Sequence, residues 1–147
     1  MKIGVELAHY EVVASLGKGG MGEVFTAEDT KLHRRVALKV LPKEMAADPV
    51  RRSRFEREAR AVAALSHPNI VTVFSFEESD GVHVITMELI EGKTLTKVLP
   101  RSGFALSELL EVVIPLADAV SSAHSKGITH RDLKPDNIMI DQEGRLR

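Results

Sequence analysis

The most informative stretch of the sequence is His130–Asn137, which reads His-Arg-Asp-Leu-Lys-Pro-Asp-Asn. It brings a carboxylate, an ammonium group and an amide together just after a segment that is predicted to be helical. Asp132 can accept a proton from a hydroxyl group, Lys134 can offset charge on a phosphoryl group, and Asn137 can ligate Mg²⁺ through oxygen. Pro135 favours an irregular loop. Each residue alone could be a solvated loop residue, but the eight residues together are not expected by chance.

The composition indicates a globular protein of one domain at most. The chain has 147 residues, of which 44% are apolar and 28% are charged, and this is enough to form a core. The net charge of −1 gives no basic surface for nucleic acid. The absence of Cys excludes disulfides and thiolate metal sites. No apolar run is long enough to span a membrane, so we expect a cytoplasmic protein without nucleic-acid partner or membrane segment.

A glycine cluster follows the first predicted strand, which covers residues 10–16. Gly17, Gly19, Gly22 and Val24 fit the pattern G-x-G-x-x-G-x-V. Such glycines allow a tight turn and let backbone amides approach phosphate oxygens. A strand follows the cluster instead of a helix, so the pattern favours a hairpin over a dinucleotide-binding unit. An ordinary glycine-rich turn remains the alternative.

Lys39 lies in the third predicted strand, residues 35–41, where its ammonium group could meet an anionic phosphate. Asp48 and Pro49 predict the start of a helix with an apolar stripe. Glu58 falls on that stripe, and a buried carboxylate needs a counter-charge. We therefore expect Glu58 to pair with Lys39, with a solvated strand lysine as the alternative.

The remaining elements predict an α+β fold. Strands are expected at 70–76 and 82–89, a linker at 91–93, and a long helix over 107–126 that ends at Gly127. This helix is apolar around most of its circumference, which is typical of a buried helix. A small hairpin is expected around the turn at 141–144.

Three stretches described above, the glycine cluster, the strand with Lys39 and the loop His130–Asn137, resemble a protein kinase. They correspond to the Gly-rich loop, Val-Ala-Leu-Lys at 36–39 and the His-Arg-Asp loop, and they occur in family order. The stretches 16–24, 67–71 and 132–137 are most similar to bacterial Ser/Thr kinases with a eukaryotic-type catalytic domain. The resemblance runs from about Tyr10 to Arg147. It implies a kinase-like fold with a five-stranded antiparallel N-lobe sheet and one helix over about 10–90. The linker 91–93 and the first helical part and catalytic loop of a C-lobe, 94–147, would follow.

The resemblance also implies a Ser/Thr protein kinase that transfers the γ-phosphate of ATP to a protein substrate with the help of Mg²⁺. Asp132 would be the base, Lys134 would contact the γ-phosphate, and Asn137 would be a magnesium ligand. Lys39 would hold the α- and β-phosphates and pair with Glu58. The other residues implied to contact ATP are Leu16, Gly17, Lys18, Gly19, Gly20, Met21, Gly22, Glu23, Val24, Ala37, Met139, the gatekeeper Met87, and Glu88 and Ile90 through their backbones. In this family Arg131 would bind a phosphorylated activation loop.

By the family resemblance, the sequence lacks the Asp-Phe-Gly whose Asp supplies the main magnesium ligand, and it also lacks the activation loop and the Ala-Pro-Glu segment. We therefore expect an N-terminal part of a kinase domain that is inactive alone. A pseudokinase-like nucleotide-binding or partner-binding module is the alternative. Without further cover, the helix at 107–126 is expected to expose apolar surface, and the chain could self-associate through this C-lobe surface.

Overall fold

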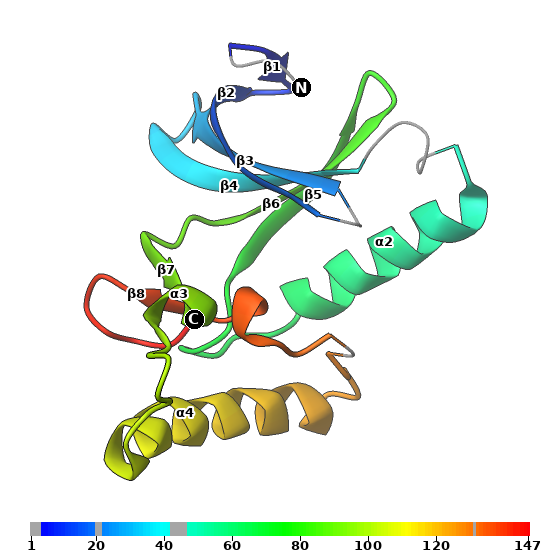
Figure 1. Ribbon diagram of the computed structural model, residues 1–147. Helices are drawn as coiled ribbons and strands as arrows, with labels where there is room; N and C mark the ends of the chain where they lie inside the picture. The colour runs from blue at the N-terminus through cyan, green and yellow to red at the C-terminus, as the bar shows by residue number, and fades with distance from the viewer. Residues whose placement is uncertain (1–3, 20–21, 42–46, 131) are drawn as a thin grey trace. The chain divides into compact units, whose positions relative to one another are not determined.

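The structure is a computed structural model that describes residues 4–19, 22–41, 47–130 and 132–147, with the side chain of Glu58 also outside the description (Figure 1). The chain divides into two compact units. Unit 1 contains residues 1–64 and 72–89, and unit 2 contains residues 65–71 and 90–147.

Unit 1 is built on a sheet of six antiparallel strands in the order β1-β2-β3-β4-β6-β5. The strands are β1 Glu6–Leu7, β2 Tyr10–Gly19, β3 Gly22–Asp29, β4 Arg34–Leu41, β5 Val73–Ser79 and β6 Val82–Glu88. The α+β prediction is confirmed, but the expected five strands are joined by β1. This strand of two residues pairs Leu7 with Tyr10 and is too short to leave a periodic signal in the sequence.

The described residues of unit 1 contain one helix, α2 Pro49–Ala63, which begins where the sequence predicts. Asp48 Oδ1 accepts hydrogen bonds from the backbone N–H groups of Val50 at 2.9 Å and Arg51 at 3.3 Å. These bonds satisfy two donors that a helix start leaves open, and Pro49 has no N–H to satisfy.

The sheet of unit 1 has an apolar core on each face. One core contains Val12, Phe25, Leu38 and neighbours from β1 to β6. On the other face, Phe55 and Ala59 of α2 pack against strand residues Leu41 and Ile85. α2 therefore covers one specific face of the sheet.

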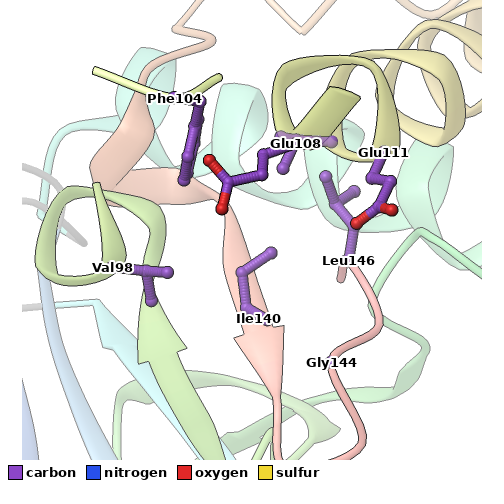
Figure 2. A pocket seen from close by; sticks show the side chains of 8 residues that line it. Val98, Phe104, Glu108, Glu111, Ile140, Gly144 and Leu146 are labelled. Carbon is purple, nitrogen blue, oxygen red and sulfur yellow. The ribbon is translucent and has the colours of Figure 1, made fainter. Parts of the chain in front are cut away.

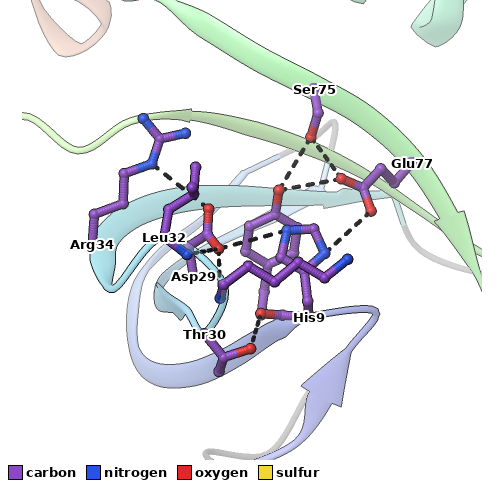
Figure 3. Close-up of polar contacts among 9 residues, drawn as sticks. His9, Asp29, Thr30, Leu32, Arg34, Ser75 and Glu77 are labelled. Carbon is purple, nitrogen blue, oxygen red and sulfur yellow. Dashed lines mark hydrogen bonds and ion pairs between the residues drawn. The ribbon is translucent and has the colours of Figure 1, made fainter.

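A polar cluster joins strands of unit 1 that are not neighbours in the sheet order (Figure 3). The hydroxyl of Tyr10, in β2, donates to Glu77 Oε1, in β5, at 3.2 Å. His9 lies 3.6 Å from Asp29 Oδ1 and 4.0 Å from Glu77 Oε2. The backbone N–H groups of Lys31 and Leu32 also donate to Asp29, at 3.1 and 3.0 Å. The cluster therefore joins β2 to β5, although these strands are not neighbours in the sheet.

Unit 2 combines a small sheet with helices. Its elements are β7 Gly92–Thr94, α3 Leu95–Val98, α4 Leu106–Ser125, the 3₁₀ turn η1 Pro135–Asn137 and β8 Met139–Asp141. β7 and β8 pair in antiparallel fashion, and an additional bridge joins Ile140 to Leu146, which confirms the predicted hairpin. Gly127 follows α4 with a φ of 74°, a conformation that favours glycine at a helix end.

α4 exposes apolar side chains, as expected for this helix without further cover, although its apolar circumference alone is typical of a buried helix. Among its residues only Ala119 is fully buried. Val112 and Leu116, with Phe104, pack against the core formed by Leu95, Ile138 and Leu146. Apolar side chains elsewhere on the helix are exposed, namely Leu106, Leu109, Leu110, Val113 and Ile114. In the described part of the chain, none of the helices has the length and apolar character needed to cross a membrane.

The segment 65–71 departs from the prediction of a strand at 70–76, because β5 begins only at Val73. The preceding residues are bound within unit 2. The Asn69 amide donates to the carbonyl of Leu146 at 2.8 Å, and Arg147 Nη1 donates to the carbonyl of Pro68 at 2.8 Å. His67 Nε2 lies 2.8 Å from Asp118 Oδ2 on α4. Because these long-range bonds hold residues 67–69 in unit 2, the strand begins only after them.

Candidate functional site

The glycine cluster forms the turn region of the hairpin β2–β3. Gly17 pairs with Val24, Lys18 with Glu23 and Gly19 with Gly22, while Gly20 and Met21 lie outside the described residues. No described heavy atom lies within 4 Å of the position that a Cβ on Gly17 would occupy. The predicted hairpin is therefore present, with open space over Gly17.

Lys18 and Glu23 contact each other across this hairpin. Lys18 Nζ lies 2.9 Å from Glu23 Oε1. This hydrogen bond with Lys18 is the main cause that holds the pKa of Glu23 below its usual value. Their salt bridge ties the two strands together beside the glycines, and Leu16 is exposed next to it.

The strand register places predicted nucleotide-binding residues on one face of the sheet in unit 1. Lys39 pairs with Val24 on one side, and Ala37 pairs with Met87 on the other. Directly paired residues share a face, as do alternate residues along a strand, so these four side chains lie on the same face. Ile85, opposite Lys39 in β6, also lies there and packs against α2.

Lys39 is half-buried on the face that α2 covers. Glu58 lies in α2 beside the buried Ala59, but its side chain is outside the described part of the structure. No ion pair joins Lys39 to a described side chain. The pairing of Lys39 with Glu58 therefore stays a prediction, which their location on one side of the sheet favours.

Glu88 ends β6 and is fixed by Thr72. Its backbone N–H donates to the Thr72 carbonyl at 2.9 Å, and its Oε2 accepts from the Thr72 N–H at 3.3 Å. Because the amide proton of Glu88 is used in this bond, a ligand contact through this backbone would involve the carbonyl group. Ile90, the other residue predicted to contact adenine through its backbone, begins the second part of unit 2.

In unit 2, the loop before β8 brings the three predicted catalytic side chains together. Lys134 Nζ lies 3.1 Å from Asp132 Oδ2. The Asn137 amide nitrogen donates to the Asp132 carbonyl at 2.8 Å and to its Oδ2 at 3.2 Å. The N–H of Asp132 donates to His130 Nδ1 at 3.2 Å. Arg131 lies outside the described residues.

These contacts set the charge of Asp132. The hydrogen bond from Lys134 is the largest cause that holds the pKa of Asp132 below its usual value, and Asn137 contributes in the same direction. Asp132 is therefore an anion at neutral pH. Its side chain is 62% exposed, so a substrate hydroxyl could reach it.

The donor set around Asn137 fits a magnesium ion that is also bound by phosphates. Asn137 uses its amide N–H groups on Asp132, and no described donor bonds its Oδ1, which leaves a hard oxygen ligand. Among the described residues there is no group of three His, Cys, Asp or Glu side chains that could hold a metal by itself. Mg²⁺ commonly takes few protein ligands together with phosphate oxygens, and Asn137 is compatible with that arrangement.

The structure adds contacts of the loop that the sequence does not predict. Thr96, in α3, donates its hydroxyl to Asp136 Oδ1 at 2.6 Å, and the Leu95 N–H donates to the Ile138 carbonyl at 2.7 Å. The predicted adenine contact Met139 pairs with Thr94 in the adjoining sheet. Residues 94–96 therefore anchor the middle of η1 and the two residues that follow it, and a sequence separation of about 40 residues leaves no local signal for this.

Comparison with known proteins supports the resemblance of this chain to protein kinases. Residues 10–147 match the model of the protein kinase domain. The chain is 43% identical to the probable serine/threonine-protein kinase PknB of Corynebacterium glutamicum, covering 94% of this chain and 22% of that protein. It is 38% identical to the serine/threonine-protein kinase PrkC of Bacillus subtilis, covering 100% of this chain and 23% of that protein.

A solved structure has the same fold. The crystal structure of the Mycobacterium tuberculosis PknI kinase domain superposes with a TM-score of 0.85 at 36% identity, covering 99% of this chain and 59% of that chain. The chain spans less than a quarter of the length of the two curated relatives. The family match extends over the glycine hairpin, Lys39 and the Asp132 loop alike, and the chain therefore belongs to the protein kinase family.

Proposed function

We propose that the chain forms the ATP-binding part and the catalytic loop of a serine/threonine protein kinase. The main support for the proposal is that Lys134 and Asn137 both contact the carboxylate of Asp132. This arrangement holds an anionic acceptor, a cation and an amide oxygen in one short loop, as phosphoryl transfer to a hydroxyl requires.

In the proposed reaction Asp132 orients a substrate hydroxyl and accepts its proton. Lys134 offsets charge on the transferred phosphoryl group. Asn137 would hold Mg²⁺ through its Oδ1, and the ion, when bound, neutralises charge on the β- and γ-phosphates. The mutual contacts of the three side chains keep the acceptor ionised and oriented before substrate binds.

The nucleotide contacts are proposed for the residues of the glycine hairpin and the sheet face beside it. The glycine backbone would approach the phosphates, and Lys39, supported by Glu58, would hold the α- and β-phosphates. Val24, Ala37 and Met87 share the face of Lys39 and offer apolar contact to adenine. Leu16 and Met139, with the backbones of Glu88 and Ile90, would complete the adenine contacts by the family resemblance.

The Asp132 loop and the named relatives indicate which residues of a substrate would accept the phosphoryl group. Lys134 stands two residues after Asp132, as in Ser/Thr kinases, and the relatives named above are serine/threonine-protein kinases. We propose a protein substrate with Ser or Thr and a reaction in the cytoplasm.

A second candidate function applies to the 147 residues taken alone. They contain no Asp-Phe-Gly, so the carboxylate ligand that the family uses for Mg²⁺ is absent from them. This favours a module that binds nucleotide without efficient transfer.

Isothermal titration of the 147-residue chain with ATP and Mg²⁺ tests nucleotide binding. We expect binding that Lys39→Ala weakens by about ten- to a hundredfold, because one charge-assisted contact to phosphate contributes about 1.5–3 kcal/mol. Lys31→Ala, which removes an exposed lysine from the same unit, is the matched control and should bind like the wild type. Absence of binding, or equal affinity of the two variants, would contradict the proposed nucleotide site.

A transfer assay with ATP, Mg²⁺ and a generic Ser/Thr protein separates the two candidates. The binding module predicts background phosphorylation that does not change in Asp132→Asn. Robust transfer that disappears in Asp132→Asn would instead establish the 147 residues as a kinase and reject the binding-only function.

A further inference from the structure

Two consecutive residues of α3 bond to the loop on either side of Asn137. The Thr96 hydroxyl donates to Asp136 Oδ1 at 2.6 Å, and the Leu95 N–H donates to the Ile138 carbonyl at 2.7 Å. Asp136 and Ile138 are the immediate neighbours of Asn137 in the chain. The residue that is proposed to bind magnesium therefore lies between two points at which α3 holds the loop.

The bond between Thr96 and Asp136 is short and charge-assisted. A hydroxyl that donates to a carboxylate typically lies about 2.5–2.7 Å from it, and such bonds are stronger than those between neutral groups. Among the described residues, the Asp136 carboxylate has no other hydrogen bond or ion pair. The placement of Asp136 relative to α3 therefore depends on this one hydroxyl group.

The start of α3 is fixed by the residue that precedes Thr96. Leu95 is buried in the core of unit 2, where it packs with Ile138 and Leu146. Because Thr96 follows directly in the helix, its backbone is held close to η1. Its hydroxyl is thus placed for the contact with Asp136 without a large loss of side-chain freedom.

The end of α3 is packed less closely than its start. Val98 lines a cavity of about 210 Å³, and Phe104 and Ile140 are among the other residues around it (Figure 2). Open space beside Val98 means that apolar packing at this end contributes little to holding α3 against η1. The Thr96 hydroxyl is therefore important for that contact.

A displacement of Asp136 would be passed on to Asn137, because η1 is a single turn of three residues. The Asn137 N–H closes this turn on the Lys134 carbonyl at 2.9 Å. The side-chain amide of Asn137 contacts Asp132 at two points, at 2.8 and 3.2 Å. These two bonds require a defined position of η1.

We propose that Thr96 is a positioning residue for the catalytic loop. Its bond to Asp136 holds η1 so that Asn137 keeps its contacts with the acceptor carboxylate and presents Oδ1 to magnesium. The role of the ion rests on the proposed kinase function, whereas the coupling between Thr96 and Asn137 does not. Groups that orient a metal ligand directly change metal affinity about ten- to a hundredfold, and Thr96 acts through one further residue, so its effect is smaller.

Proton exchange with water at the Asn137 side-chain amide, followed by NMR on the 147-residue chain without nucleotide, tests the coupling. Thr96→Val keeps the branched shape but removes the hydroxyl, and it should speed this exchange about three- to tenfold as the bonds to Asp132 weaken. Thr96→Ser keeps the hydroxyl and should exchange like the wild type. Thr30→Val removes a hydroxyl bond of unit 1, to the His9 carbonyl at 2.8 Å, and should also leave the exchange unchanged.

Titration calorimetry with ATP tests the consequence for the ion. Thr96→Val should lower the affinity for ATP in the presence of Mg²⁺ about three- to tenfold, with little change in its absence, and Thr96→Ser should restore the wild-type value. If the wild type binds no ATP under either condition, the proposed function is wrong, and the exchange experiment still decides the role of Thr96.

Asp136→Ala breaks the same bond from the other side and replaces Thr96→Val if that variant does not fold. Because both changes remove one interaction, the double variant should exchange no faster than either single variant. The proposal is wrong if Thr96→Val exchanges like the wild type, if Thr96→Ser is as fast as Thr96→Val, or if Thr30→Val has the same effect. An equal loss of ATP affinity with and without Mg²⁺ would also overturn it.

Discussion

Asn137 holds Asp132 at two points, because its amide nitrogen lies 2.8 Å from the Asp132 carbonyl oxygen and 3.2 Å from Oδ2. The bond to the backbone fixes the loop, and the bond to the side chain fixes the direction of the carboxylate. The same residue is also the proposed metal ligand. Its amide group therefore links the position of the acceptor to the position of the ion.

Asn137→Ala removes both functions of this residue. We expect the affinity for ATP in the presence of Mg²⁺ to fall about tenfold, which corresponds to about 1.4 kcal/mol. The affinity for ATP without Mg²⁺ should change little, because the two hydrogen bonds that are lost join Asn137 to Asp132 and not to the nucleotide. Titration calorimetry with and without Mg²⁺ measures the two affinities. Asn69→Ala, at an amide that bonds Leu146 instead, is the control. An equal loss under both conditions would argue against a role in metal binding.

Lys134→Met should raise the pKa of Asp132 towards its ordinary value of 3.8, because the hydrogen bond from Lys134 is the main cause of the lowered pKa. NMR titration of the Asp132 side-chain carboxyl carbon follows this change directly. Lys31→Met replaces an exposed lysine of unit 1 and should leave the titration unchanged. If the Asp132 pKa is the same in wild type and Lys134→Met, the contact is not formed in solution.

Gly92→Ala should destabilise unit 2. A Cβ at position 92 would collide with the backbone carbonyl of Ile140 in β8, and backbone atoms cannot move aside as a flexible side chain could. Overpacking of this kind costs about 1–3 kcal/mol of unfolding free energy, which denaturant titration can measure. Gly17→Ala, where the added Cβ meets open space, should cost less. Equal stability of Gly92→Ala and wild type would mean that β7 and β8 do not approach as closely as described.

Asp29→Asn should make the stability of the chain less sensitive to acid. Burial by itself raises the pKa of Asp29, but the N–H groups of Leu32 and Lys31 and the charges of His9 and Arg34 outweigh it, so the pKa is lowered. A carboxylate with a lowered folded-state pKa stabilises the protein above its unfolded-state pKa and loses that contribution as pH falls through the folded-state value. Melting temperatures between pH 7 and pH 3 test this, with Asp80→Asn as the control. A parallel decline for Asp29→Asn and wild type would contradict the buried cluster.

The sequence predicts best the features that depend on neighbouring residues. Asp48 and Pro49 mark the start of α2, and Gly127 marks the end of α4, because caps act within one turn. The Asp132 loop is similarly local, so its three functional side chains are identifiable without a structure. Their contacts confirm that these side chains come together, although their roles remain proposed.

Features that depend on distant residues are predicted less well. The strand expected from residue 70 starts at Val73, since Asn69 bonds the carbonyl of Leu146 far along the chain. The anchoring of Asp136 by Thr96 is also long-range. The apolar circumference of α4 shows that its residues favour burial, but it does not specify which neighbouring element covers them, and Ile114 is 63% exposed.

Because segment 65–71 belongs to unit 2, stretches of the two units alternate along the chain. The backbone passes from one unit to the other after residues 64, 71 and 89, so neither unit is a single uninterrupted stretch of sequence. A proteolytic cut after Leu89 would leave 65–71 covalently attached to the elements of unit 1. The half released from residue 90 onward would lose the residues that bond Asp118, Leu146 and Arg147. The two units therefore cannot be prepared as separate, intact modules by cutting the chain at one point.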